Sequence, residues 1–211
     1  AQARALIVAG ADILDIGGES TRPFADPVPL EEELRRVLPV IETLAPEINV
    51  PISIDTYKAK VARAALNAGA AIINDISALR FDPDMAPLAV EMQAPVVLMH
   101  MQGTPRDMQR QPHYHDLLGE IKDFFRERLD FAASQSLPPE LLVLDPGIGF
   151  GKTWRHNLAI LNHLEVFQDL GCPLLVGASR KAFIGHILDL PAGEERDIGT
   201  LAALAVAVWR G

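Results

Sequence analysis

Cysteine is nearly absent from this sequence, and long apolar runs are missing. The single cysteine, Cys172, has no partner within the chain, so an internal disulfide is excluded. Its position just before an apolar run favours a small buried side chain over a catalytic thiol. No apolar run reaches the roughly 18 residues that cross a bilayer, and no secretory signal is visible at the start. We therefore expect a cytoplasmic protein.

An excess of positive charge and any sign of a linker are also missing. The 211 residues carry a formal net charge of −9, which argues against a nucleic-acid partner because binding to phosphate backbones rests on Lys and Arg. A few local cations still suffice to bind a small anionic substrate. No low-complexity or Gly/Ser-rich segment divides the chain, and 49% hydrophobic residues allow one large core. The prediction is a single domain over residues 1–211.

Metal-ligand spacing is not found among the histidines. His113 and His115 lie in a polar segment with no third ligand nearby, which is not a zinc pattern. The sequence therefore predicts no metal ligand within this chain. His100 follows an apolar run and is a candidate for a supporting role behind a site.

Six short apolar runs each lead into polar residues or a glycine turn. They start near residues 12, 50, 71, 95, 141 and 173, and amphipathic patterns at helical spacing separate them. Such runs are typical of buried parallel strands covered by helices, so the fold class is α/β. A helical stretch precedes the first run and another follows the last, which favours a (β/α)8 TIM barrel that lacks strand 1 and strand 8. The alternative is an open six-stranded doubly wound sheet.

Three strand ends carry an acid or an amide: Asp55, Asn74 and Asp145. Ligands of parallel sheets bind beyond the carboxyl ends of the strands, so these side chains are expected to share one site. Each has a purely structural alternative, as a helix cap for Asp55 and Asn74 and as a tight turn for Asp145. Together they suit a flat ligand whose edge combines N–H donors with ring-nitrogen acceptors, such as a 2-amino-4-oxo-pteridine.

Three loops after strands add further candidates. Residues 17–23 (GGESTRP) combine a glycine turn with the hydroxyls of Ser20 and Thr21 and the guanidinium of Arg22, a set suited to an anionic oxygen. Residues 147–153 (GIGFGKT) resemble a phosphate-binding loop but fail its spacing, because Pro146 holds the position of the first glycine. Residues 179–181 (SRK) follow the last run.

These motifs together resemble the dihydropteroate synthase family. The resemblance runs from about residue 11 to residue 181 and rests on six segments in the same order: 15–23, 52–56, 73–76, 98–103, 144–152 and 177–181. It implies a (β/α)8 barrel, usually homodimeric, that joins p-aminobenzoate to 6-hydroxymethyl-7,8-dihydropterin pyrophosphate in folate biosynthesis. Pyrophosphate is released, Mg²⁺ is the cofactor, and sulfonamides target the family. The family's metal ligand lies in a loop after strand 1, which is outside this sequence.

The resemblance also implies residue roles. The pterin would be held by Asp55, Asn74, Asp145 and Lys181, with Met99, Phe150 and Gly177 as the pocket wall. The p-aminobenzoate and pyrophosphate side would include Thr21, Arg22 and Ser179, and the catalytic residues would be Asp55, Lys181 and Arg22.

Two alternatives remain, of which one is another pterin-binding barrel enzyme and the other belongs to a different class. A methyltetrahydrofolate:corrinoid methyltransferase would use similar Asp and Asn positions for its pterin, but it has no need of Ser20-Thr21-Arg22 or of Ser179-Arg180-Lys181. An inactive pterin-binding fragment would bind a pterin and form no product. Without the regions that hold Mg²⁺ and pyrophosphate in the family, the isolated chain is expected to be poorly active.

Overall fold

The computed structural model describes residues 1–211 and divides them into two compact units. The first unit comprises Ala1–Thr21, Asp26–Leu98 and Phe131–Leu142. The second comprises Arg22–Ala25, Met99–Asp130 and Val143–Gly211. Strands β4 and β5 and helix α5 have residues in both units. The prediction of a single domain stays a prediction.

Strands and helices alternate along the chain, as the apolar periodicity predicted. The strands are β1 (Leu14–Gly17), β2 (Ile52–Asp55), β3 (Ile72–Asp75), β4 (Val96–Met99) and β5 (Leu142–Asp145). The α-helices are α1 (Gln2–Val8), α2 (Leu30–Leu44), α3 (Ala59–Asn67), α4 (Met85–Met92), α5 (Leu117–Ser134), α6 (Trp154–Asn162), α7 (Ala182–Leu188) and α8 (Asp197–Arg210). Short 3-10 helices cover Pro139–Leu141, Leu164–Leu170 and Glu194–Arg196.

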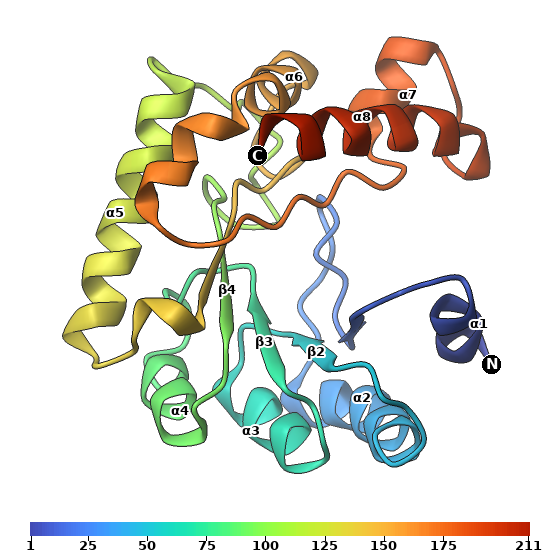
Figure 1. The fold of residues 1–211 in the computed structure, drawn as a ribbon, viewed down its shortest axis with the longest axis vertical. Helices are drawn as coiled ribbons and strands as arrows, with labels where there is room; N and C mark the ends of the chain where they lie inside the picture. The colour runs from blue at the N-terminus through green and yellow to red at the C-terminus, as the bar shows by residue number, and fades with distance from the viewer. The chain divides into compact units, whose positions relative to one another are not determined.

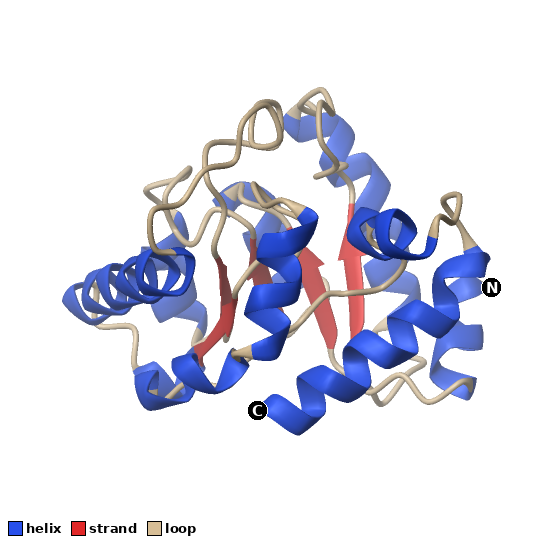
Figure 2. Cartoon of the chain, turned by 90° about the horizontal axis from the view of Figure 1, so that it is seen from above, coloured by secondary structure: helices blue, strands red, loops and turns tan.

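The sheet has the strand order β1-β2-β3-β4-β5, and Figure 2 draws the strands in red. The ladders of β1 with β2, β2 with β3 and β3 with β4 are all parallel. Strand order therefore follows chain order, with a helix after each of the first four strands. The α/β parallel architecture predicted from the sequence is confirmed.

In the first unit, helices α2, α3 and α4 lie side by side along the strands (Figure 1). Their inward faces are fully buried at Val37 and Ile41 of α2 and at Val61 of α3. Ile54 of β2 and Ile73 of β3 are also completely buried. This packing fixes the strands whose carboxyl ends carry the predicted site residues.

In the second unit, helices α6, α7 and α8 pack against one another. Phe125 of α5 and Phe167 are completely buried and meet edge to face, with ring centroids 5.7 Å apart. Cys172 is also buried, as its apolar context predicted. No helix is long and apolar enough to cross a membrane.

The sixth predicted strand is reduced to a single parallel bridge between Leu144 and Leu174. Leu144 donates to the carbonyl of Pro173 at 2.9 Å, and Leu175 donates to the carbonyl of Leu144 at 2.9 Å. The segment thus runs parallel to β5, but the prediction of a full strand over residues 173–179 is wrong. Beyond Leu175 the segment forms no further backbone hydrogen bond with β5, so a continuous strand does not form.

Candidate active site

The carboxyl ends of β1, β2 and β3 bring three polar side chains together in the first unit. Gly17 is the register partner of Asp55, and Asp55 is the register partner of Asn74. A Cβ on Gly17 would lie 3.1 Å from the Cβ of Asp55, so glycine leaves room for that carboxyl. The side-chain amide of Asn74 donates to Asp15 Oδ2 at 3.0 Å. This bond uses one of the two N–H donors of the amide and orients the group, so the side-chain oxygen of Asn74 is left as an acceptor for a ligand.

Asp55 is surrounded by carboxyl groups and little opposes them. Burial raises the pKa of Asp55 to about 8, and the negative charges of Asp15, Glu33, Asp75 and Glu19 add to the rise. The pKa of Asp15 is raised by burial, against hydrogen bonds from Ser53 and Asn74 that lower it. The carboxyl group of Asp55 is therefore largely protonated at neutral pH in the free chain, and a ligand with N–H donors or a developing positive charge favours its ionised form.

Lys58 holds the loop after β1 in place. Its ammonium forms salt bridges with Glu19 in that loop and with Glu33 in the first turn of α2. It also donates to the carbonyl of Val28 at 2.7 Å. Glu33 is buried and accepts from the hydroxyl of Thr56 at 2.7 Å. The loop that carries Thr21 is thereby tied to the residues that follow β2.

The helix-cap alternative does not hold for Asp55, whereas a local structural role does hold for the neighbouring Asp75. Asp55 is not a helix cap, because α3 begins at Ala59 with Lys58 at the cap position. Asp75 does serve its own turn, since it accepts from the backbone N–H groups of Ser77 and Leu79 at 2.8 Å. Its neighbour Asn74 bonds instead to Asp15, so its side chain does not cap a helix, and its role towards a ligand stays a prediction.

In the second unit, Asp145 lies near two lysines. Its Oδ1 accepts from the N–H of Gly147 at 2.7 Å, as the tight-turn alternative predicts, and its role towards a ligand stays a prediction. Burial raises the pKa of Asp145, while the positive charges of Lys181 and Lys152 oppose the rise. The amine of Lys181 lies 4.5 Å from the ring centroid of Phe150 and donates to the carbonyl of Ile148. Burial lowers the pKa of Lys181, and Asp145 opposes that change.

The glycine turn after β5 packs tightly against the segment that follows β4. Gly147, Gly149 and Gly151 all have positive φ, at 67°, 85° and 60°. A Cβ on Gly147 would lie 2.0 Å from the carbonyl oxygen of His100 and 3.3 Å from Met99. Only glycine fits that position, which places Met99 beside the turn that holds Phe150.

The remaining predicted residues are placed as follows. A Cβ on Gly177 would lie 3.9 Å from the amine of Lys181, so Gly177 borders the same part of the site as Phe150. Thr21 is half-buried, whereas Arg22 and Ser179 are exposed. Arg180, which precedes Lys181, donates two hydrogen bonds to the carboxylate of Asp197.

Two supporting side chains were not among the predicted site residues. Asp15 orients Asn74, and its signal was a carboxylate inside an apolar strand. Lys152 donates to His100 and to the carbonyl of Phe150. Its signal was a lysine directly after a glycine turn, which the failed phosphate-loop pattern left unassigned.

The carboxylates of this chain do not fit a divalent cation. No group of three or more His, Cys, Asp or Glu side chains is placed to hold a metal ion. The carboxyl groups around Asp55 are engaged with Asn74, Lys58 and Thr56 rather than converging on a point.

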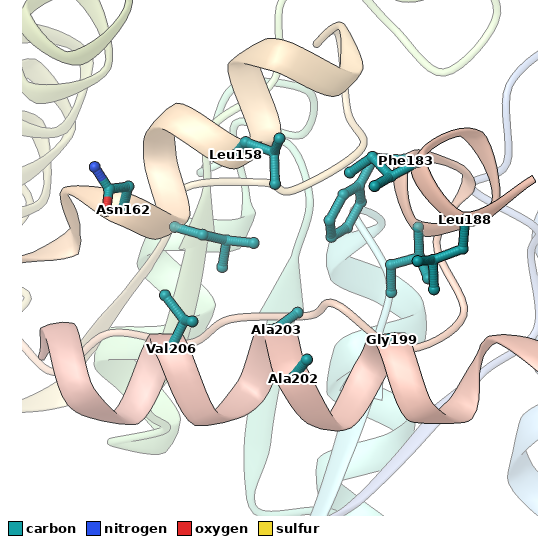
Figure 3. Close-up of a pocket in the computed structure, with 11 residues that line it drawn as sticks. Leu158, Asn162, Phe183, Leu188, Gly199, Ala202, Ala203 and Val206 are labelled. Carbon is teal, nitrogen blue, oxygen red and sulfur yellow. The ribbon is translucent and has the colours of Figure 1, made fainter.

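An apolar cavity of about 400 Å³ lies among α6, α7 and α8 in the second unit. Figure 3 shows Leu158, Phe183, Leu188 and Val206 around it. None of the predicted site residues lines it, so it is separate from the polar groups described above.

Residues 1–211 of this chain match a protein family that is described as "Pterin binding enzyme". The chain therefore belongs to the family of pterin-binding enzymes.

Relatives with assigned names specify the branch of that family. Dihydropteroate synthase of Synechocystis is 49% identical over 210 residues, which cover 100% of this chain and 73% of the relative. The Bacillus subtilis dihydropteroate synthase is 47% identical, over 99% of this chain and 70% of the relative. A crystal structure of the Yersinia pestis enzyme with a sulfonamide drug complex superimposes with a TM-score of 0.95 at 43% identity, over 99% of this chain and 75% of that one. The predicted function, that of a dihydropteroate synthase and hence a transferase, is confirmed.

Proposed function

We propose that this chain holds the pterin of the dihydropteroate synthase reaction with Asp55, Asn74, Asp145 and Lys181. The observation that carries the proposal is the pairing of Asp55 with Asn74 in register at the strand ends, with Asn74 oriented by Asp15. A carboxylate accepts two parallel bonds from a guanidine-like ring edge, and the amide oxygen of Asn74 accepts a third. In this proposal Phe150, Met99 and Gly177 form the apolar wall against the ring.

The acidic strand ends stabilise the charge that develops during the reaction. The bond from the pterin methylene to pyrophosphate breaks, and its electron pair leaves with pyrophosphate. Positive charge then spreads over the methylene and the pterin ring. The N–H donors of the bound pterin favour the ionised form of Asp55, and this carboxylate lowers the energy of the cation from a position that is fixed before the reaction begins. The amine of p-aminobenzoate next forms the new C–N bond and loses a proton.

The p-aminobenzoate and pyrophosphate side is proposed to include Thr21, Arg22 and Ser179. Arg22 and Ser179 are exposed, and a guanidinium beside hydroxyl groups suits both a carboxylate and a phosphate. Lys58 supports this role for Thr21 because it anchors the loop after β1 through Glu19. Sulfonamides, which carry an arylamine like that of p-aminobenzoate, are proposed to compete on this side.

A homodimer is part of the proposal and has its own support. Helix α8 buries Thr200, Ala203 and Ala207 on one side. Its opposite side exposes large apolar side chains, among them Ile198, Leu201, Val208 and Trp209. A second copy of the chain would remove these groups from water. Sedimentation of the wild type and of Leu201→Glu tests this, and a monomer in both refutes it. The cofactor Mg²⁺ and the cytoplasmic location stay predictions of the sequence.

The reaction itself is tested by product formation. The chain is incubated with the pterin pyrophosphate, p-aminobenzoate and Mg²⁺, and dihydropteroate is separated and quantified. We expect product that depends on both substrates and is lost in Asp55→Asn. A chain that binds the pterin and forms no product is the inactive alternative, and a chain indifferent to p-aminobenzoate refutes the proposal.

A further inference from the structure

Lys152 is a buried lysine that the reaction described above does not use. It is 3% exposed and lies directly after the glycine turn formed by residues 147–151. Its ammonium donates to the carbonyl of Phe150 at 2.9 Å and to the carbonyl of His100 at 3.2 Å. Its third contact is with Nδ1 of His100, at 2.9 Å. All three donors of the ammonium are thus engaged, two of them by backbone oxygens.

These bonds join two segments that are far apart in the sequence. Phe150 belongs to the glycine turn after β5, and His100 follows β4. The two segments are already in close contact, because a Cβ on Gly151 would lie 3.1 Å from the backbone nitrogen of Gln102. Lys152 therefore links the glycine turn to the segment that follows β4.

Other side chains bond to the same turn from the loop between β4 and α5 and from α6. Gln109 donates to the carbonyl of Gly149 at 2.6 Å, and Tyr114 donates to the carbonyl of Gly151 at 2.9 Å. The N–H of Gly149 donates to Asn157 of α6 at 2.8 Å. Two cations bond to the turn, Lys152 and Lys181. Of these, Lys152 also bonds to His100 in the segment after β4.

The charge on Lys152 is unfavourable for stability. Burial lowers its pKa to about 7, and the negative charge of Asp145 opposes the change while Lys181 adds to it. The ionisable groups around it are Asp145 on β5, His100 after β4, His156 on α6 and Lys181 before α7. An apolar side chain of the same length would avoid the cost of burying an ammonium. The ammonium is therefore best explained by the geometry that it fixes.

The turn carries several of the groups that are proposed to hold the pterin. Asp145 bonds to the N–H of Gly147, Lys181 bonds to the carbonyl of Ile148, and the ring of Phe150 lies beside Lys181. A displacement of the turn would move all three together.

We propose that Lys152 is a positioning residue of the pterin site, which fixes the turn of residues 147–151, and with it Phe150 and Lys181, through the carbonyls of Phe150 and His100. The inference rests on the proposed function, because it takes Asp145, Phe150 and Lys181 to be pterin contacts. It adds a role for a side chain that does not touch the ligand.

The test compares Lys152→Met with Lys152→Gln and with the exposed control Lys60→Met on α3. Pterin affinity is measured by calorimetry with 6-hydroxymethylpterin, and folding is checked by circular dichroism and thermal melting. We expect Lys152→Met to fold and to bind the pterin about tenfold more weakly, because the turn is no longer held in place. Lys152→Gln, which keeps one amide donor, should lie between Lys152→Met and the wild type. Lys60→Met should match the wild type.

Three results would overturn the inference. Equal affinity in Lys152→Met and the wild type would show that the turn keeps its geometry without the ammonium. Failure of both Lys152 variants to fold would make the residue structural. Absence of pterin binding by the wild type would refute the proposed function and this inference with it, whereas the first two results leave the proposed function intact.

Discussion

Carboxyl groups at the ends of parallel strands have different surroundings in the two compact units. In the first unit, Asp55 lies among Asp15, Glu33, Asp75 and Glu19, and its pKa rises to about 8. In the second unit, the charges that act on Asp145 are those of Lys181 and Lys152, and they oppose the effect of burial on its pKa. Burial raises the pKa of both groups, and the neighbouring charges decide whether that rise is reinforced, as at Asp55, or opposed, as at Asp145.

The largest effect is expected for Asp55→Asn. The substitution keeps the shape of the side chain and removes a carboxyl group whose charge forms when N–H donors of the bound pterin lower its pKa, so turnover should fall by about 100-fold or more. Steady-state formation of dihydropteroate measures this. Turnover close to that of the wild type would remove Asp55 from the charge-stabilising role and would leave the acidic surroundings without a function.

The same variant should be more stable than the wild type at neutral and alkaline pH. The folded-state pKa of Asp55 is about 8 and its ordinary value is 3.8, so between these values the folded chain binds more protons than the unfolded chain. The contribution of Asp55 to the free energy of unfolding therefore falls as pH rises through this range. We expect Asp55→Asn to gain on the order of 1 kcal/mol at about pH 8, or roughly 2–4 °C in Tm. An unchanged or lower Tm in melts across this range would contradict the raised pKa.

Gly147→Ala should strongly destabilise the second unit. The new Cβ would lie 2.0 Å from the carbonyl oxygen of His100, at a residue whose φ is 67°. Gly171→Ala is the matched control, because Gly171 has a φ of 75° and no atom within 4 Å of a new Cβ. Denaturant unfolding should show a loss of about 1 kcal/mol in the control and about 3 kcal/mol in Gly147→Ala. Equal losses would mean that the turn is not packed against the segment after β4.

Lys152→Met should change the pH dependence of stability in the sense opposite to Asp55→Asn. The folded-state pKa of Lys152 is about 7 and its ordinary value is 10.5. Between these values the unfolded chain binds more protons, so this group makes the free energy of unfolding rise with pH. The rise between about pH 7 and about pH 9 should be smaller in Lys152→Met. If the free energy of unfolding, measured by denaturant titration, rose equally with pH in the two proteins, the pKa of Lys152 would be close to its ordinary value, and the lowered pKa would be contradicted.

The smallest effect is expected for Asp15→Asn. An asparagine here still accepts the bond from the amide of Asn74, but it removes one negative charge from the surroundings of Asp55. The pKa of Asp55 should therefore fall, by roughly half a pH unit or less, since burial is the larger cause of its rise. The pH midpoint of the Tm curve reports this change, and a higher pKa in the variant would contradict the assigned causes.

The architecture could be predicted from the sequence because local patterns specify it. Ile/Val/Leu runs located β2, β3, β4 and β5, and periodic apolar residues located α2, α3 and α5. The polar strand ends followed, because parallel strands bring their carboxyl ends to one edge of the sheet. The strand predicted at residues 173–179 failed because a local pattern does not reveal whether a neighbouring strand pairs along its whole length.

The supporting contacts could not be predicted, because they join residues remote in sequence. Asp15 and Asn74 are 59 positions apart, and Lys152 and His100 are 52 apart. Neither pair has a spacing that signals its contact. The raised pKa of Asp55 was likewise hidden, because its largest cause is burial, which arises only when the elements pack together.

The most direct test of the acidic site is an NMR titration of the side-chain carboxyl carbon of Asp55, with and without a bound pterin. The account predicts a midpoint near the value of about 8 in the ligand-free chain. It also predicts a decrease of about one pH unit or more with the pterin, because N–H donors of the ring stabilise the carboxylate. A midpoint near the ordinary value of 3.8 in the free chain, or no change on adding the pterin, would contradict it.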